Sequence, residues 1–319
     1  MNKKDENPNA IGGFLDLEMP ITVKNNLPPM LSCGRNGLQW IIEHIQCDRV
    51  YLPYYICPVV PDVLNKAGVQ VEFYHINEQL MPEELPCLKD NEYFLYVNYF
   101  GVCDAACKKF IELFGNKLIL DLTQAFFFDV PVQIKSFSSA RKFIGVPDGC
   151  CITGVDTQYI SELPRYNGAA NAAHLLLRQD GDLPAGYAAF THHGSTFSEM
   201  RQISLLSQNI LKHIDFKAVN DRRQNNFSIL HKFLGNINQL KNLCSCAALC
   251  YPLLLPNGLA IKKQLCENKI FVPTYWPNIS NVLTDAENYF IDNLICLPID
   301  QRYDTTHMQF VLKKICSLL

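Results

Sequence analysis

A lysine in a hydroxyl-rich segment is the group in this sequence most suited to covalent chemistry. Lys142 follows Ser136, Ser138 and Arg141 within residues 135–149. The ordinary pKa of a lysine amine is about 10.4, and burial or a neighbouring positive charge lowers it, which leaves free amine to attack a carbonyl group. Arg141 carries such a charge. The pattern alone also fits a surface lysine beside an arginine, as most Arg–Lys pairs are.

A carboxylate at the end of an apolar strand is the second candidate. Asp121 lies in the run Leu-Ile-Leu-Asp-Leu at residues 118–122, and Gln124 follows three residues later. Asp121 can cap a helix with Gln124 as its capping-box partner. It can also pair with a protonated heterocyclic nitrogen, an ion pair that a low dielectric strengthens. Taken alone, the motif favours the cap.

A segment with two glycines is the third candidate. Residues 32–37 read Ser-Cys-Gly-Arg-Asn-Gly and open an amphipathic helix. The free N–H groups and the positive end of such a helix can hold a phosphate. The segment matches neither GxxxxGK[ST] nor GxGxxG, so it is not a nucleotide signature, and a two-glycine loop is more often only the start of a helix.

Short apolar strands alternate with helices through the first part of the chain. We expect strands at 50–52, 69–76, 94–99 and 118–122, and helices at 38–45, 59–66 and 105–114. This alternation predicts a mainly parallel sheet with helices on both faces, since the strands are continuously apolar. Functional residues then lie beyond the carboxyl ends of the strands.

The pattern becomes helical from about residue 195, and we place a domain boundary near Phe216. Residues 1–216 form the larger domain, and residues 217–319 form a small α+β domain. The elements expected there are strands at 250–255, 269–272 and 294–297, and helices at 259–266 and 307–318.

Composition narrows the class of protein. The chain has 319 residues, 48% of them hydrophobic and 18% charged, and a formal net charge of −3, which gives no footprint for nucleic acid. The longest nearly apolar run, residues 246–255, is half of the ~20 residues that a membrane span needs, and residues 1–10 are polar, without a secretory signal. We therefore expect a cytoplasmic protein with neither membrane nor nucleic acid as a partner.

The cysteines and histidines predict no metal site. The 14 cysteines are scattered without a CxxC pair, which is typical of reduced thiols in a cytosol. Neither Cys244, Cys246 and Cys250 nor His192 and His193 have the spacing of a structural zinc site.

The order of the three candidate motifs resembles a known family. A phosphate loop, a strand-end Asp with Gln three residues on, and Ser-Phe followed by Lys occur in this order in the DegT/StrS-type sugar aminotransferases. These belong to the aspartate-aminotransferase superfamily, which uses pyridoxal 5'-phosphate (PLP). The similarity runs from about residue 31 to the end, and further matching segments are residues 52–57, 97–101, 251–254, 270–277 and 297–300.

The chain also departs from the family pattern. The interval from Ser136 to Lys142 is one residue longer, the usual His is absent, and Cys150 follows Gly149 where the family has a second glycine. The family's Arg-Met-Ser element appears only as Gln-Ile-Ser at residues 202–204. The chain is also shorter than typical members.

The resemblance implies a fold and a set of roles. The fold class is α/β: a PLP-dependent transferase-like large domain with a mainly parallel mixed sheet, plus the small C-terminal α+β domain. Lys142 is implied as the Schiff-base lysine that also moves the substrate proton, and Asp121 as the partner of the pyridine nitrogen. The residues implied to hold the rest of the cofactor are Gln124 at the phenolic oxygen, Tyr55 stacked on the ring, and, at the phosphate, the amides of Gly34, Arg35 and Asn36 with the hydroxyl of Ser136 or Ser138.

The implied activity is transfer of an amino group from an amino acid such as glutamate to a keto group, on a nucleotide-linked sugar, by a homodimer. The alternative is a non-catalytic or regulatory binding protein with the PLP fold. A sugar dehydratase is disfavoured because those relatives replace the lysine with histidine. A hydrolase is disfavoured because the chain has no GxSxG motif and residues 192–195 are too local to form a triad.

Overall fold

A six-stranded sheet forms the centre of the larger part of the protein. The computed structural model describes residues 19, 23–241, 243, 247–277 and 283–319. The strands are β1 (Arg49–Pro53), β2 (Gln70–Tyr74), β3 (Glu92–Val97), β4 (Leu118–Leu122), β5 (Lys135–Ser138) and β6 (Ile152–Thr153). Their order is β2-β1-β3-β4-β5-β6, and every pairing is parallel except β5 with β6. The predicted mainly parallel mixed sheet is confirmed.

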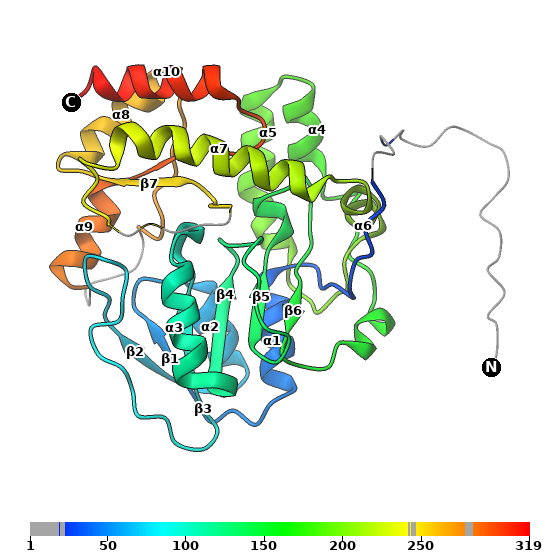
Figure 1. Ribbon diagram of the computed structural model, residues 1–319. Helices are drawn as coiled ribbons and strands as arrows, with labels where there is room; N and C mark the ends of the chain where they lie inside the picture. Colours follow the sequence, from blue (N-terminus) through cyan, green and yellow to red (C-terminus); the bar gives the residue numbers. More distant parts are fainter. Residues whose placement is uncertain (1–18, 20–22, 242, 244–246, 278–282) are drawn as a thin grey trace, which may run out of the picture.

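Helices cover both faces of this sheet. α1 (Gly34–Glu43) and α2 (Val59–Lys66) pack against each other on one face, whereas α3 (Asp104–Phe114) lies on the other, in front of the sheet in Figure 1. The chain moves outward from β1 to β2 and then back past β1 to β3 and β4. Since right-handed crossovers in opposite directions place their helices on opposite faces, β1 and β3 mark the switch point where such sheets bind ligands.

Burial explains why these segments are strands. All five residues of β4 are buried, because helices cover the sheet on both sides. The parallel register places Asp121 beside Val97 of β3 and Phe137 of β5. The carboxyl ends of three neighbouring strands are thus level, and Asp121 lies at the edge of the sheet where the chain turns.

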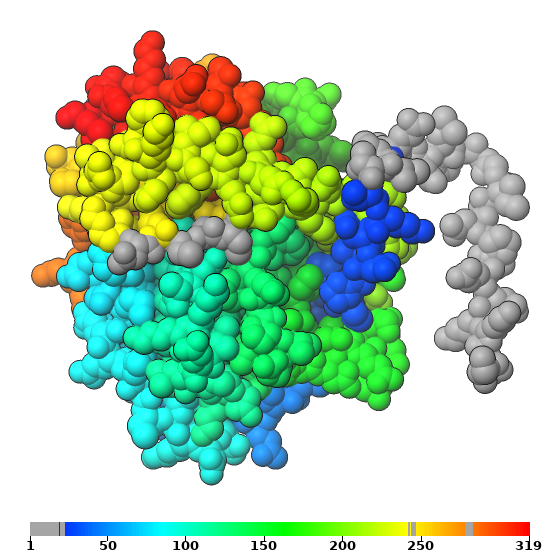
Figure 2. Space-filling view, in the orientation of Figure 1, coloured from blue at the N-terminus to red at the C-terminus, as the bar shows by residue number. Residues whose placement is uncertain are grey.

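The C-terminal part lies over this same edge of the sheet. Its elements are α7 (Phe216–Leu234), β7 (Tyr251–Leu254), α8 (Gly258–Glu267), α9 (Asp285–Asn293), β8 (Leu294–Leu297) and α10 (Thr305–Cys316). β7 and β8 form an antiparallel pair. Figure 2 shows the yellow α7 lying across the green and cyan body, and one hydrophobic core runs from Leu31 in the first part to Ile315 in the last helix. The boundary predicted near Phe216 falls at the first residue of α7.

The structure differs from the sequence-based expectation in three helices that were not predicted and in one predicted strand that does not form. The sequence did not indicate α4 (Ala173–Gln179), α5 (Leu183–His193) or α9, although α6 (Leu205–Lys212) was expected. His192 and His193 form the last turn of α5. The strand predicted at 269–272 is wrong: Lys269 has a φ of 61°, outside the extended region, and residues 270–272 pair with no described strand.

No helix in the described ranges is long and apolar enough to cross a membrane. Within the same ranges, no group of three or more His, Cys, Asp or Glu side chains is placed to hold a metal ion. Cys244 and Cys246 lie outside the described residues.

Candidate active site

A cavity lies at the carboxyl ends of the strands, next to the switch point between β1 and β3. Its walls come from the start of α1, the segment from the end of β1 into α2, the turn after β4, and the segment after β5. The residues that line it are Cys33, Gly34, Arg35, Leu38, Cys57, Val59, Val60, Asp121, Thr123, Phe137, Ser139, Arg141, Lys142 and Phe197. With Phe197, which follows α5, five segments far apart in sequence therefore contribute to one site.

Lys142 and Asp121 meet in this cavity through Thr123. Lys142 ends a short 3-10 helix (Ala140–Lys142), and its Nζ donates to Thr123 Oγ1 at 3.0 Å. The Thr123 amide donates to Asp121 Oδ1 at 2.8 Å. The structure thus brings together the amine and the carboxylate that the sequence singled out.

The cavity changes the proton affinity of Lys142. Its side chain is exposed to water through the cavity mouth, but protein surrounds the amine, and this desolvation lowers the pKa of Lys142. The Asp121 carboxylate and the Cys57 thiol oppose that change, whereas the Arg141 guanidinium adds to it. The net direction is downward, so more free amine is present near neutral pH than an ordinary lysine provides.

We therefore expect Lys142 to react with acetic anhydride at a lower pH than an ordinary lysine. Only the free amine is nucleophilic, so the midpoint of labelling follows the pKa of the amine. Peptide mass spectrometry across a pH series measures that midpoint at Lys142, with the exposed Lys108 of α3 as an internal reference. A Lys142 midpoint equal to or above that of Lys108 would contradict the expectation.

Asp121 is held as a buried acid. Its side chain is 3% exposed, and burial raises the pKa of its carboxyl group, while the Lys142 ammonium and the Thr123 amide lower it in part. The buried Asp121 carboxylate would therefore favour binding of a cation next to it. A protonated heterocyclic nitrogen is one such cation.

Two arginines make the opposite wall strongly positive. Arg35 Nη1 donates to the Phe197 carbonyl at 3.1 Å, and the Arg141 guanidinium lies 5.4 Å from the centroid of the Phe197 ring. Burial and then Arg35 lower the pKa of Arg141, with Cys33 and Tyr166 opposing. In the described part of the chain, the arginines that form ion pairs with carboxylates are Arg49, Arg201 and Arg302. The charges of Arg35 and Arg141 are therefore not balanced by such a pair there.

This positive wall surrounds the first turn of α1. The amides of Gly34, Arg35 and Asn36 begin the helix and have no carbonyl within it to bond. A Cβ on Gly34 would lie 2.9 Å from Thr123 Cγ2, so a larger residue there would displace the Thr123 side chain that accepts from Lys142 Nζ. Helix amides and two guanidinium groups together suit a doubly charged anion such as a phosphate.

The structure corrects the choice of serine. In β5, side chains alternate between two sides, and Phe137 faces the cavity. Ser136 and Ser138 therefore point away: Ser136 Oγ bonds Thr153 Oγ1 at 2.8 Å, and Ser138 Oγ donates to the Cys151 carbonyl at 3.3 Å. Ser139 shares the side of Phe137 and lines the cavity, so of the three serines it is the one placed to contact a ligand there.

The structure also corrects the role of Tyr55. Its ring is 1% exposed and packs against Tyr99 and, edge-on, against Trp276, with ring centroids 5.9 and 4.8 Å apart. It lies in the core below the C-terminal part and not over the cavity. Cys57 and Val59 come from the same segment and line the cavity instead.

The side chains of the remaining predicted residues, Asn36 and Gln124, bond to other parts of the protein and do not line the cavity. The Asn36 side chain accepts from Ser32 Oγ at 2.7 Å and donates to the Glu199 carbonyl at 3.1 Å, so only its backbone amide is available to a ligand. Gln124 Oε1 accepts from the Phe100 amide at 2.6 Å, and Gln124 Nε2 is buried with no hydrogen-bond partner among the described residues. Its predicted contact with a phenolic oxygen stays a prediction.

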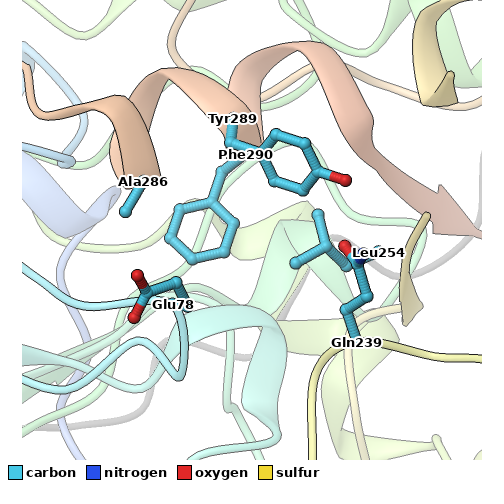
Figure 3. A pocket seen from close by; sticks show the side chains of 6 residues that line it. All are labelled: Glu78, Gln239, Leu254, Ala286, Tyr289 and Phe290. Atoms are coloured by element: carbon cyan, nitrogen blue, oxygen red, sulfur yellow. The ribbon is translucent and has the colours of Figure 1, made fainter. Parts of the chain in front are cut away.

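A second cavity is chemically different. It lies between α9 and the segment after β2 (Figure 3). Its lining is Glu78, Gln239, Leu254, Ala286, Tyr289 and Phe290. The one charged group among these described residues is a carboxylate, which repels an anion, whereas the cavity around Lys142 is lined by three cationic side chains. The chemistry therefore selects the cavity around Lys142.

Comparison with solved structures identifies the fold. A sugar aminotransferase from Micromonospora echinospora superposes with a TM-score of 0.62 at 12% identity, over 90% of this chain and 86% of the other. An aminotransferase of the DegT, DnrJ, EryC1 and StrS type from Brucella abortus gives 0.57 at 12%, over 91% and 85%. A Bacillus subtilis protein solved with the cofactor PMP gives 0.62 at 11%, over 91% and 72%.

No protein-family profile and no curated protein sequence matches this chain. The fold is that of the PLP-dependent aminotransferases, as the resemblance implied, and the structural neighbours include sugar aminotransferases of the DegT/StrS type. The low identities mark a divergent sequence on that fold.

Proposed function

We propose that this protein is a PLP-dependent aminotransferase that moves an amino group from an amino acid to the keto group of a sugar. One observation carries the proposal: Lys142 and Asp121, 21 residues apart in sequence, line the same cavity as the cationic start of α1. Few chemistries need an amine of lowered pKa, a buried carboxylate and a phosphate site within one small cavity, and PLP needs all three.

Residues present in the cavity fit the cofactor. The amides of the first turn of α1, the guanidinium groups of Arg35 and Arg141, and Ser139 would hold its phosphate. Asp121 would hold the ring nitrogen in its protonated form. When bound, PLP supplies an aldehyde that accepts an amino group and a ring that withdraws electrons from the neighbouring carbon.

Lys142 would carry the reactive amine of the protein. Its lowered pKa leaves the amine able to attack the aldehyde and then to take and return a proton at the substrate carbon. Thr123 accepts a hydrogen bond from Nζ, which keeps the amine beside the carboxylate of Asp121. The buried position of Asp121 keeps water from screening its charge.

The sugar acceptor, the homodimer and the cytoplasmic location are part of the proposal. The sugar acceptor is supported by structural neighbours described as sugar aminotransferases and by another neighbour solved in the presence of its TDP-sugar product. The homodimer rests on the family resemblance, and the cytoplasmic location rests on the sequence analysis. A nucleotide-linked keto sugar is therefore the first acceptor to test, with glutamate as the amino donor.

The test begins with cofactor capture. The purified chain is mixed with PLP and reduced with borohydride, and peptide mass spectrometry locates the attached cofactor. We expect attachment at Lys142, followed in the unreduced protein by glutamate-dependent formation of pyridoxamine phosphate. Attachment without any amino transfer would favour the non-catalytic binding protein, and no attachment at Lys142 would refute both functions.

We expect Arg141→Gln to weaken binding of PLP by roughly tenfold or more, because a hydrogen bond to a charged group contributes about 1.5–3 kcal/mol. Binding of pyridoxal, which has no phosphate, should change little. Fluorescence titration of the two ligands measures both constants, and Arg178→Gln, an exposed arginine at the end of α4, is the matched control. Equal losses for PLP and pyridoxal would show that Arg141 does not bind the phosphate.

A further inference from the structure

Arg223 of α7 is a buried cation that the proposed chemistry does not use. Its side chain is 2% exposed, which makes it one of the largest fully buried side chains of the protein. Burial lowers its pKa to about 10. Asp300 is the carboxylate that favours its charge, but that carboxylate is itself held by Arg302 through two contacts, at 2.6 and 2.9 Å.

The two terminal nitrogens of the Arg223 guanidinium donate hydrogen bonds to backbone carbonyls. Nη1 donates to the carbonyls of Ala248 and Leu249 at 3.0 and 3.3 Å, and Nη2 donates to the Phe143 carbonyl at 3.2 Å. The guanidinium also lies 4.7 Å from the centroid of the Phe143 ring. A buried cation with this set of bonds fixes the position of the segments it joins.

Phe143 directly follows Lys142, and its carbonyl receives a second donor from the C-terminal part. Gln301 Nε2 donates to the Phe143 carbonyl at 2.7 Å, and Gln301 Oε1 accepts from Arg223 Nε at 3.1 Å. On the other side of Lys142, the amides of Phe143 and Ile144 both donate to the Ala140 carbonyl, at 2.9 and 2.8 Å. The backbone that carries Lys142 is thus held on both sides.

Residues 248–249, which accept from Arg223, are also joined by hydrogen bonds to the turn after β4, on the Asp121 side of the site. The Leu249 amide donates to the Phe100 carbonyl at 2.8 Å, and the Phe100 amide donates to Gln124 Oε1 at 2.6 Å. Arg223 therefore joins the segment after Lys142 to the turn after β4, three residues beyond Asp121, through residues 248–249. The two groups proposed to meet in the cavity have a common anchor outside it.

Resting on the proposed function, we propose that Arg223, together with Gln301, is a positioning residue that holds the Lys142 amine in the cavity by fixing the Phe143 carbonyl. The C-terminal part then sets the reactivity of a lysine that it does not touch. A lysine at position 223 carries its three donors on one nitrogen atom, so it lacks the planar fork with which Arg223 reaches the three carbonyls and Gln301 Oε1 from three separate nitrogens.

The pKa of the Lys142 amine, measured without any cofactor, tests this positioning role. If the segment loosens, the amine spends more time in water and its pKa rises towards the ordinary value. The titratable or charged groups that share its cavity are Asp121 from β4, Cys57 from the segment after β1, Arg35 and Cys33 from the start of α1, and Arg141 beside it. None of these is changed by substitution at position 223 or 301.

The variants are Arg223→Met, Arg223→Lys and Gln301→Leu, with Arg222→Met as the control, because Arg222 is the exposed neighbour on the same helix. Acetic anhydride labelling across pH, well below the melting temperature, gives the midpoint for Lys142 in each protein. We expect the midpoint to rise by about one pH unit in Arg223→Met, by less in Arg223→Lys and Gln301→Leu, and not at all in the control.

A second readout is the rate at which PLP and borohydride trap Lys142. We expect a fall of about tenfold in Arg223→Met, because a displaced nucleophile is less often in reach. Unchanged midpoints and rates in Arg223→Met would overturn the positioning role, and Gln301→Leu decides by the same criteria if Arg223→Met does not fold. Failure of wild-type protein to capture PLP would instead refute the proposed function, while the labelling midpoints would still test the positioning.

Discussion

Lys142→Ala should abolish covalent capture of PLP and lower amino transfer by about 10⁴-fold or more, the upper range for loss of a group that acts on protons in the transition state. The effect should exceed that of any other single substitution in the cavity, because Lys142 is proposed both to attack the aldehyde and to move the substrate proton. Single-turnover formation of pyridoxamine phosphate from glutamate and PLP measures the loss. The chain itself should fold normally, since the Lys142 side chain is exposed and bonds only Thr123.

The control for this variant is Lys262→Ala. Lys262 is also a lysine of lowered pKa, but its Nζ donates to the Ile291 carbonyl at 2.8 Å in the C-terminal part, away from the cavity. Capture of PLP should persist in Lys262→Ala even where stability falls. Rescue of Lys142→Ala by added ethylamine would show that a free amine is the missing group, whereas full activity of Lys142→Ala would end the proposal.

The order of short motifs was enough to predict where the amine and the carboxylate meet. Asp121 was expected at the end of an apolar strand, but the strand that leads to Lys142, β5, was not predicted, and the two residues were linked by the family resemblance. In the structure, the parallel pairing of β4 and β5 brings both to one edge. The helix at Gly34 was predicted from its apolar spacing. The strand end and the helix needed only local patterns, whereas the meeting of Lys142 with Asp121 rested on the family resemblance.

The serines and Arg141 could have been placed better from the sequence. Phe137 and Ser139 are two residues apart, so they share one side of a strand, and a strand assignment at 135–138 would have excluded Ser136 and Ser138. Arg141 was considered only for its effect on the lysine. It lines the same cavity as Arg35, which supports the proposal that it also binds the phosphate.

Other features depend on contacts that no local pattern contains. The orientation of Tyr55 is set by Trp276, more than two hundred residues later in the chain. The segment after Lys269 has the composition of a strand but no partner strand, and α5 exposes Tyr187 and Phe190. The amphipathic pattern on which helix prediction relies is therefore missing from α5.

Asp121→Asn should separate function from stability. Asparagine keeps the shape of the side chain and an oxygen for the Thr123 amide, but it carries no charge to hold a protonated ring nitrogen. Removing one partner of a buried ion pair costs about 3–5 kcal/mol, so amino transfer should fall by roughly 10²–10³-fold. Steady-state kinetics with saturating PLP measures this loss, and Asp129→Asn, a carboxylate outside the cavity lining, should leave the rate unchanged.

In the cofactor-free protein, Asp121→Asn should increase stability, although it lowers activity in the presence of PLP. Burial raises the pKa of Asp121 above its ordinary value, so the charged carboxylate destabilises the folded state at neutral pH, and this cost disappears as the pH falls through the raised pKa. Asp121→Asn removes the cost, so its melting temperature without PLP should exceed that of the wild type at pH 7, by roughly 2–4 °C per kcal/mol relieved. The difference should vanish in acid. A variant both less active and less stable at pH 7 would mean that Asp121 is a structural cap, because a carboxylate kept for a cationic ligand destabilises the empty cavity.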